Sequence, residues 1–240
     1  MNKEKHFVGY ITAGDGGIKK SLDYALALIN GGITMLEIGV PFSDPIADGP
    51  VIQRAMTRAL KSNTTLKDII YLTKEIRKHS NIPLILFSYL NPLLSVQNTD
   101  FFKEAKLAGI NGVLIVDCPM EAAQLNHDLE PIYVITPNTS ISRIQELDKS
   151  GKGFLYYACR KGTTGIKAGL PDDFVEKIQL IKSHATLPVV TGFGISTREM
   201  AEKVLEHADG FVVGSLFVKA IEDGMTPAEL TCLAKSLNPL

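Results

Sequence analysis

Eight short runs of strand-forming apolar residues recur along the chain, and they restrict its possible folds more than any other feature. They are Phe7–Ile11, Thr34–Ile38, Leu84–Tyr89, Gly112–Val116, Ile132–Ile135, Phe154–Ala158, Pro188–Val190 and Gly210–Val213. Several are apolar at every position, as in Leu-Ile-Leu-Phe and Val-Leu-Ile-Val. Strands of that kind belong to a sheet that is covered on both faces.

Helical patterns separate these runs. Apolar residues at i, i+3 and i+4 spacing predict helices over Ser21–Ile29, Leu66–Ile76, Phe174–Ile181 and Met200–Leu205. Strands that alternate with helices indicate βαβ units and a parallel sheet. Eight units without a linker or low-complexity stretch predict one (β/α)8 barrel, a single domain over residues 1–240. A doubly wound open sheet is the alternative, but the first strand lacks the G-x-G-x-x-G turn of that fold.

Composition restricts the partners and the compartment. The 240 residues carry a net charge of −1, which gives no electrostatic footprint for nucleic acid or an anionic membrane. No apolar run approaches the ~18 residues of a membrane span, and the first residues lack a signal-peptide core. The three cysteines are far apart and odd in number. We therefore expect free thiols and a cytoplasmic protein.

The segment Met35–Gln53 carries the strongest functional signal. An apolar strand ends in Glu37, and a proline-rich loop with a second carboxylate, Asp48, follows. Burying an unpaired charge is costly, so a carboxylate at this point indicates a function. Strand alternation puts Ile33, Met35 and Glu37 on one face. If that face lines the barrel, desolvation raises the pKa of Glu37 and prepares it for proton transfer.

Asp48 lies on a loop that we expect to be more solvated, so this carboxylate should stay ionised. Two carboxylates in unlike environments suit an acid–base pair. The alternative is structural. In that case Glu37 pairs with a basic residue, and Asp48 only caps the helix that begins near Pro50.

Glycine-rich loops follow the seventh and eighth predicted strands. The first holds Gly192 and Gly194, and the second begins with Gly214 and Ser215. Both come just before a predicted helix N-terminus, which favours anions. Because loops after strands 7 and 8 of a barrel commonly bind phosphate, we predict a phosphate site there. The glycine-rich segment after strand 6, from Arg160 onward, predicts either a disordered connection or a lid.

The remaining residues restrict the chemistry. The five histidines stand alone, so no metal site is expected. None of the predicted strands ends in an internal lysine, which disfavours a Schiff-base mechanism. We therefore expect acid–base chemistry on a small phosphorylated molecule, with neither a metal nor a covalent intermediate.

The segment from Glu37 to Gln53 resembles the signature of the tryptophan synthase alpha subunit family. Further matching segments are Tyr10–Asp15, Ser88–Pro92, Gly112–Pro119, Tyr156–Gly165, Gly192–Ser196 and Val213–Ser215. The resemblance implies a (β/α)8 barrel that acts as a lyase in the last steps of L-tryptophan biosynthesis. The reaction is retro-aldol cleavage of indole-3-glycerol phosphate to indole and glyceraldehyde 3-phosphate.

The resemblance also implies residue roles. Glu37 would protonate indole C3 and take the proton of the side-chain hydroxyl, while Asp48 would bind the indole N–H. The implied substrate-binding residues are Tyr10, Tyr89, Tyr156, Thr164, Gly165, Gly192, Phe193, Gly194, Gly214 and Ser215. Within this set, Gly192, Gly194, Gly214 and Ser215 map onto the phosphate site. Thr164 maps onto a lid threonine that bonds the loop aspartate on closure.

Finally, the resemblance implies a partner. The family works with a pyridoxal-phosphate beta subunit in an alpha2-beta2 heterotetramer, and that subunit receives the indole. The loop with Pro41, Phe42 and Asp44 would contact it. The pyridoxal phosphate would belong to the partner, and no cofactor is expected in this chain. Two alternatives stay open: another phosphate-binding barrel, or a catalytically weak alpha subunit that mainly activates its partner.

Overall fold

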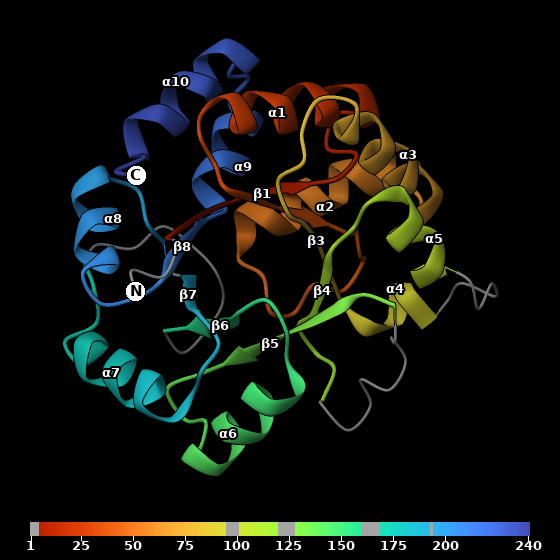
Figure 1. Cartoon of the computed structure of the whole chain (residues 1–240). Coiled ribbons are helices and arrows are strands. Elements are labelled where there is room, and N and C mark those ends of the chain that lie inside the picture. Colours follow the sequence, from red (N-terminus) through yellow and green to blue (C-terminus); the bar gives the residue numbers. More distant parts are fainter. Residues whose placement is uncertain (1–4, 95–100, 120–127, 160–168, 193) are drawn as a thin grey trace.

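The strands form a closed parallel barrel in which each strand pairs with its neighbours in chain order (Figure 1). The computed structural model describes residues 5–94, 101–119, 128–159, 169–192 and 194–240. The strands are β1 (His6–Thr12), β2 (Met35–Gly39), β3 (Leu84–Ser88), β4 (Gly112–Ile115), β5 (Glu130–Ile135), β6 (Leu155–Ala158), β7 (Val189–Gly192) and β8 (Gly210–Val213). Pairing of β8 with β1 closes the barrel, which confirms the predicted (β/α)8 fold.

Helices surround the barrel (Figure 1). Those described are α1 (Ile18–Asn30), α2 (Pro50–Lys61), α3 (Leu66–Arg77), α4 (Leu90–Leu94), α5 (Phe101–Ala108), α6 (Ile141–Ser150), α7 (Phe174–His184), α8 (Arg198–Leu205), α9 (Ser215–Glu222) and α10 (Pro227–Leu237). The four helices predicted from apolar spacing are confirmed as α1, α3, α7 and α8. Thr65 caps α3 through a reciprocal pair of hydrogen bonds with Asp68, which explains its sharp start.

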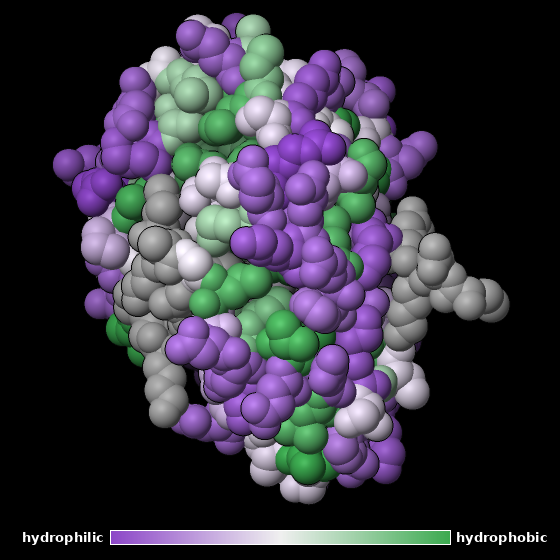
Figure 2. Space-filling model, turned by 90° about the vertical axis from the view of Figure 1, so that its left-hand side faces the viewer, coloured by the Kyte–Doolittle hydropathy of each residue, from purple (hydrophilic) through white to green (hydrophobic). Residues whose placement is uncertain are grey.

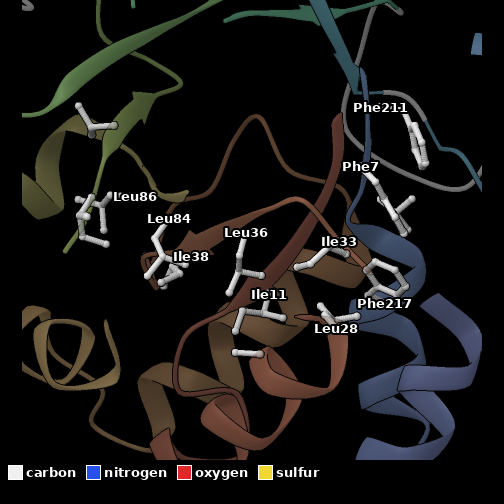
Figure 3. Close-up of a cluster of buried hydrophobic side chains, with 14 of the residues drawn as sticks. Phe7, Ile11, Leu28, Ile33, Leu36, Ile38, Leu84, Leu86, Phe211 and Phe217 are labelled. Atoms are coloured by element: carbon white, nitrogen blue, oxygen red, sulfur yellow. The ribbon is translucent and has the colours of Figure 1, made fainter. Parts of the chain in front are cut away.

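Alternation along the strands divides the core into two layers. Side chains of one face pack inside the barrel, among them Val8, Tyr10 and Met35. Those of the other face pack against the helices, as Figure 3 shows for the cluster around Leu28, Leu36 and Phe217. Because strands β2 and β3 are covered on both sides, every residue in them is buried.

The expectation that Ile33 shares the inner face with Met35 is wrong. Ile33 packs in the outer layer, beside Leu28 and against Gly9 (Figure 3). The reason is that β2, and its pairing with β1, begins only at Met35, and strict alternation holds only for extended backbone. Met35 lies in the inner layer as predicted.

Polar side chains, coloured purple, cover most of the flank seen in Figure 2, with hydrophobic ones in separated groups between them. That distribution is typical of the outer surface of a ring of amphipathic helices. Within the described part of the chain, none of the helices combines the length and the apolar character that crossing a membrane requires.

Arg77, the last residue of α3, binds several carbonyl groups at the barrel end where the strands begin. Its guanidinium donates to the carbonyl oxygens of Ser80 (3.0 Å), Ile82 (2.7 Å) and Gly109 (2.7 and 3.1 Å), and to Oδ1 of Asn111 (2.8 Å). Burial lowers the pKa of Arg77. The side chain therefore satisfies acceptors of two βα units at once.

We expect Arg77→Met to lower the free energy of unfolding by about 2–4 kcal/mol, because several carbonyls lose their donor. Urea denaturation measures this change. The control is Arg198→Met, which removes a half-exposed pair with Glu202 and should cost less than ~1 kcal/mol. Equal effects of the two substitutions would contradict the assignment.

Candidate active site

Glu37 points into the barrel from the middle of β2. It is adjacent to Tyr10 in the β1–β2 register and is 1% exposed. Its Oε1 has no hydrogen-bond partner, and burial alone raises the pKa of this carboxyl to about 8. Among the described residues, no basic side chain forms an ion pair with Glu37, as the structural alternative would require. At neutral pH, Glu37 is therefore mostly a protonated acid that can give up its proton.

Asp48 is buried as deeply as Glu37, also at 1% exposure, so the expectation of a more solvated loop is wrong. The loop folds back onto Tyr89, whose hydroxyl donates to Oδ2 of Asp48 (2.8 Å) and accepts from the backbone N–H of Ala47 (2.9 Å). Burial raises the pKa of Asp48 to about 6, and the Tyr89 hydrogen bond opposes that rise. Asp48 thus remains mainly ionised at neutral pH, as predicted.

Within the described residues, the two acids differ in their hydrogen bonds: Asp48 accepts one from Tyr89, whereas Oε1 of Glu37 has no partner. Tyr89 supports the charged form of Asp48, whereas nothing described supports a charged Glu37. The alternative that Asp48 caps α2 is wrong, because the N-cap residue of that helix is Gly49.

Tyr10 on β1 and Tyr156 on β6 lie close to both acids. Burial, and then the nearby charges of Asp48 and Glu37, raise the pKa of both phenols well above the usual value. The Tyr10 ring meets Phe87 edge-on, with ring centroids 5.4 Å apart. The structure thus brings four predicted residues into one group, and Tyr89 joins it through Asp48.

Two inward glycines make room for these tyrosine rings. A Cβ atom at Gly39 would lie 2.1 Å from the Tyr10 hydroxyl oxygen, and one at Gly192 would lie 1.8 Å from that of Tyr156. Gly39 is not among the site residues predicted from the sequence, and Gly192 is predicted only as part of the phosphate site. The steric role could have been predicted, because each glycine ends a strand whose neighbour carries an inward-facing tyrosine.

We expect Gly192→Ala to lower kcat/KM by ~10–100-fold, because displacement of a positioned ring by about 1 Å costs that much. Steady-state kinetics on this variant tests the expectation, and a kcat/KM within about threefold of wild type would contradict the steric role.

The predicted phosphate site lies at the start of α9. Gly214 precedes this helix, no side chain caps its first turn, and Ser215 is buried. Backbone N–H groups of an uncapped first turn favour an anion. Gly214 is also in contact range of Tyr10, which lies near both acids, so the helix start is adjacent to the acid pair. Gly194, in the preceding loop, has a positive φ of 42°.

Some predicted residues lie outside the described part of the chain: Thr164, Gly165, Phe193 and the segment from Arg160 to residue 168. The predicted interface loop is described. Pro41 is buried, Asp44 is exposed, and the Phe42 ring packs on Tyr89 with centroids 5.1 Å apart. Two surface grooves, one of about 710 Å³ and one of about 680 Å³, flank this loop. Within the described ranges, no group of three His, Cys, Asp or Glu side chains could hold a metal ion.

A (β/α)8 barrel with two buried carboxylates beside an uncapped helix start defines an acid–base enzyme for a small anionic substrate. The family model for the tryptophan synthase alpha chain matches residues 1–237. The chain belongs to this family, whose members are lyases that cleave indole-3-glycerol phosphate in tryptophan biosynthesis. Alpha chains of the family work together with a beta subunit.

Individual relatives agree with the family match. The chain is 51% identical to the tryptophan synthase alpha chain of Coxiella burnetii, over 100% of this chain and 95% of that protein. It is 47% identical to the alpha chain of Chlamydia felis, over 98% and 95%. A solved mutant alpha subunit from Pyrococcus furiosus superposes with a TM-score of 0.87 at 34% identity, covering 99% of each chain. The alpha subunit of Legionella pneumophila gives a TM-score of 0.87 at 35% identity, over 98% and 92%.

Proposed function

We propose that Glu37 and Asp48 carry out the retro-aldol cleavage of indole-3-glycerol phosphate in this chain. One observation carries the proposal: two buried carboxylates lie beside the same tyrosines, one without a described partner and the other held by Tyr89. The pKa of about 8 keeps Glu37 protonated at neutral pH, and the pKa of about 6 keeps Asp48 charged. This is the pairing that a charge-separated ring intermediate requires.

The proton movements start at indole C3. Glu37 gives its proton to C3, and the ring nitrogen takes up positive charge that Asp48 stabilises through the indole N–H. The Glu37 carboxylate then accepts the proton of the side-chain hydroxyl next to the ring. As the O–H electrons form the aldehyde C=O, the bond between C3 and the side chain breaks, and its electrons return to the ring. Indole and glyceraldehyde 3-phosphate result, and Glu37 is protonated again.

The remaining residues of the site bind and orient the substrate. In this proposal, Gly214, Ser215 and the loop with Gly192 and Gly194 bind the phosphate, supported by the uncapped start of α9. Tyr10 and Tyr156 lie beside the indole. Phe193, Thr164 and Gly165 keep the roles that the resemblance implies, and Thr164 closes the lid onto Asp48.

We propose that this chain and a beta subunit form an alpha2-beta2 heterotetramer. The loop Pro41, Phe42 and Asp44 contacts the beta subunit, and the exposed Ile46 beside it supports a docking role. Phe42 packs on Tyr89, so a partner that contacts Phe42 would be separated from Tyr89, the residue that binds Asp48, by this one side chain. The pyridoxal phosphate belongs to the beta subunit, and no cofactor is placed in this chain. The three cysteines are not in disulfides, which supports a cytoplasmic location.

The direct test is release of indole from indole-3-glycerol phosphate by the purified chain, alone and with a beta subunit. Indole release that disappears in Glu37→Gln supports the proposal. Consumption of the substrate without indole would instead indicate an isomerase or synthase. Stimulation of the beta subunit without any indole release would indicate a non-catalytic activator.

We expect a bell-shaped pH profile of kcat/KM, with limbs near pH 6 and pH 8. Below pH 6, Asp48 becomes protonated and loses the charge that stabilises the ring. Above pH 8, Glu37 ionises and has no proton to give. The two groups are neighbours, so the limbs report the pair. Initial rates from pH 5 to pH 10 measure the profile, and activity that keeps rising above pH 9 would contradict it.

A further inference from the structure

Arg58 in α2 forms a two-pronged ion pair with a buried carboxylate on another element. Its Nε and Nη2 donate to Oδ1 and Oδ2 of Asp15 at 2.7 and 2.8 Å. Asp15 lies in the loop after β1 and is 7% exposed. A bidentate ion pair of this kind fixes the relative orientation of the two side chains as well as their distance. The contact therefore holds α2 in one position against the loop that continues from Tyr10.

The third guanidinium nitrogen of Arg58 contacts a different helix. Its Nη1 donates to Oε1 of Glu222, the last residue of α9, at 2.6 Å. Arg54, one turn earlier in α2, binds both oxygens of the same carboxylate at 2.7 Å. Arg54 is half exposed, whereas Arg58 is less accessible. Arg58 thus joins three elements: α2, the loop after β1, and the end of α9.

Both helices begin at the candidate active site. Helix α2 starts two residues after Asp48, and α9 starts directly after Gly214. The two helices pack on each other and on β1, and Ile52, Met56 and Val218 share the inner core with Tyr10. A shift of α2 along α9 would therefore change the distance between the Asp48 carboxylate and the first N–H groups of α9.

We propose that Arg58 is a positioning residue that sets the span between Asp48 and the phosphate-binding start of α9, acting through Asp15 and Glu222. The proposal rests on the proposed function, in which the indole lies at Asp48 and the phosphate at α9. A substrate that bridges both half-sites gains affinity only when their separation matches its own length. A ligand that occupies one half-site does not depend on that separation.

This difference defines the experiment. The spanning probe is 3-(indol-3-yl)propyl phosphate, which has both ends of the substrate but no hydroxyl to deprotonate. Indole and inorganic phosphate are the probes for the separate half-sites. In Arg58→Met, we expect the spanning probe to bind at least ~10-fold more weakly and kcat/KM to fall similarly. Binding of indole and of phosphate should each stay within about twofold of wild type.

Arg58→Met leaves Asp15 buried without its partner, so two further variants keep the test decisive. Arg58→Lys retains the positive charge but not the bidentate contact, and its loss of affinity for the spanning probe should be intermediate. The double variant Arg58→Met with Asp15→Asn removes the unpaired charge, and should show the full loss with better folding. The matched control is Arg198→Met on α8, which removes a half-exposed pair with Glu202 and contacts neither Asp15 nor Glu222. It should bind all three probes as wild type does.

The outcomes separate the two proposals. If the Arg58 variants bind the spanning probe as wild type does, or lose the half-site probes equally, Arg58 does not set the span. If wild type binds the spanning probe no more tightly than indole, the proposed function is wrong, and the role of Arg58 falls with it. A selective loss of binding of the spanning probe in the Arg58 variants, absent in Arg198→Met, supports the positioning role.

Discussion

Replacing Glu37 with glutamine is expected to lower kcat for indole release by ~10²–10⁴-fold, the usual cost of losing a positioned acid. Glutamine keeps the shape of the side chain but cannot donate a proton to C3 or accept one from the hydroxyl. Because Glu37 is assigned both transfers, no second residue of the proposed mechanism takes over either step. Retention of more than about a tenth of wild-type activity would contradict its role.

The same substitution should stabilise the fold at high pH. The pKa of Glu37 is near 4.5 in the unfolded chain and about 8 when folded. Between these values the folded state binds the extra proton, so wild-type stability falls as pH rises from about 4.5 to 8. Glu37→Gln lacks this loss and should be more stable than wild type at pH 9. The free energy of unfolding should differ by on the order of a few kcal/mol, because each unit of pKa shift corresponds to ~1.4 kcal/mol.

Urea denaturation at pH 6 and pH 9 measures that difference. Glu202→Gln is the control, because Glu202 is half exposed in an i,i+4 pair with Arg198 and should change little at either pH. Lower activity together with higher stability at pH 9 separates a catalytic loss from unfolding. Equal stability of wild type and Glu37→Gln at pH 9 would mean that Glu37 is not desolvated as the structure indicates.

The second large effect is expected for Asp48→Asn, with a loss of ~10²–10³-fold in kcat, comparable to removal of a single transition-state electrostatic contact. The asparagine side chain can still accept the hydrogen bond from Tyr89, so the loop should keep its position. What disappears is the negative charge opposite the indole nitrogen. The residual activity should also lose the acidic limb near pH 6, because the group that titrates there is gone.

Asp44→Asn on the same loop is the matched control, since Asp44 is exposed and remote from the barrel interior. Measured without a beta subunit, it should retain wild-type kcat and the acidic limb. If Asp48→Asn keeps the limb near pH 6, another group titrates there. In that case, Asp48 does not supply the charge that the mechanism requires.

The strands were predictable from the sequence because their signal is local. A strand buried on both faces is apolar at successive positions, as β3 and β4 are, wherever it lies in the fold. The helices that were predicted have dense apolar spacing, as α1 does. Helices α6 and α10 were not predicted, because few of their residues are buried and polar side chains break the pattern. Their positions follow from packing on α7 and α1.

The candidate site was only partly predictable. Glu37 and the glycines before α9 could be predicted, because strand ends and motif spacing can be recognised in the sequence. The burial of Asp48 does not, because it arises when the loop folds back onto Tyr89, 41 residues further along. The outward position of Ile33 likewise depends on where pairing with β1 begins.

Local residue patterns specify the eight strands, the identity of the two acids and their order along the chain. The environments and the neighbours of the two acids depend instead on how distant segments pack together. Pairing of β6 with β7 places Gly192 beside the Tyr156 ring. Packing of α2 on α9 places Arg58 between Asp15 and Glu222, and Glu222 is 164 residues further along the chain than Arg58. Such contacts depend on strand register and helix packing. Both act between segments that are far apart in the sequence, so no local residue pattern predicts them.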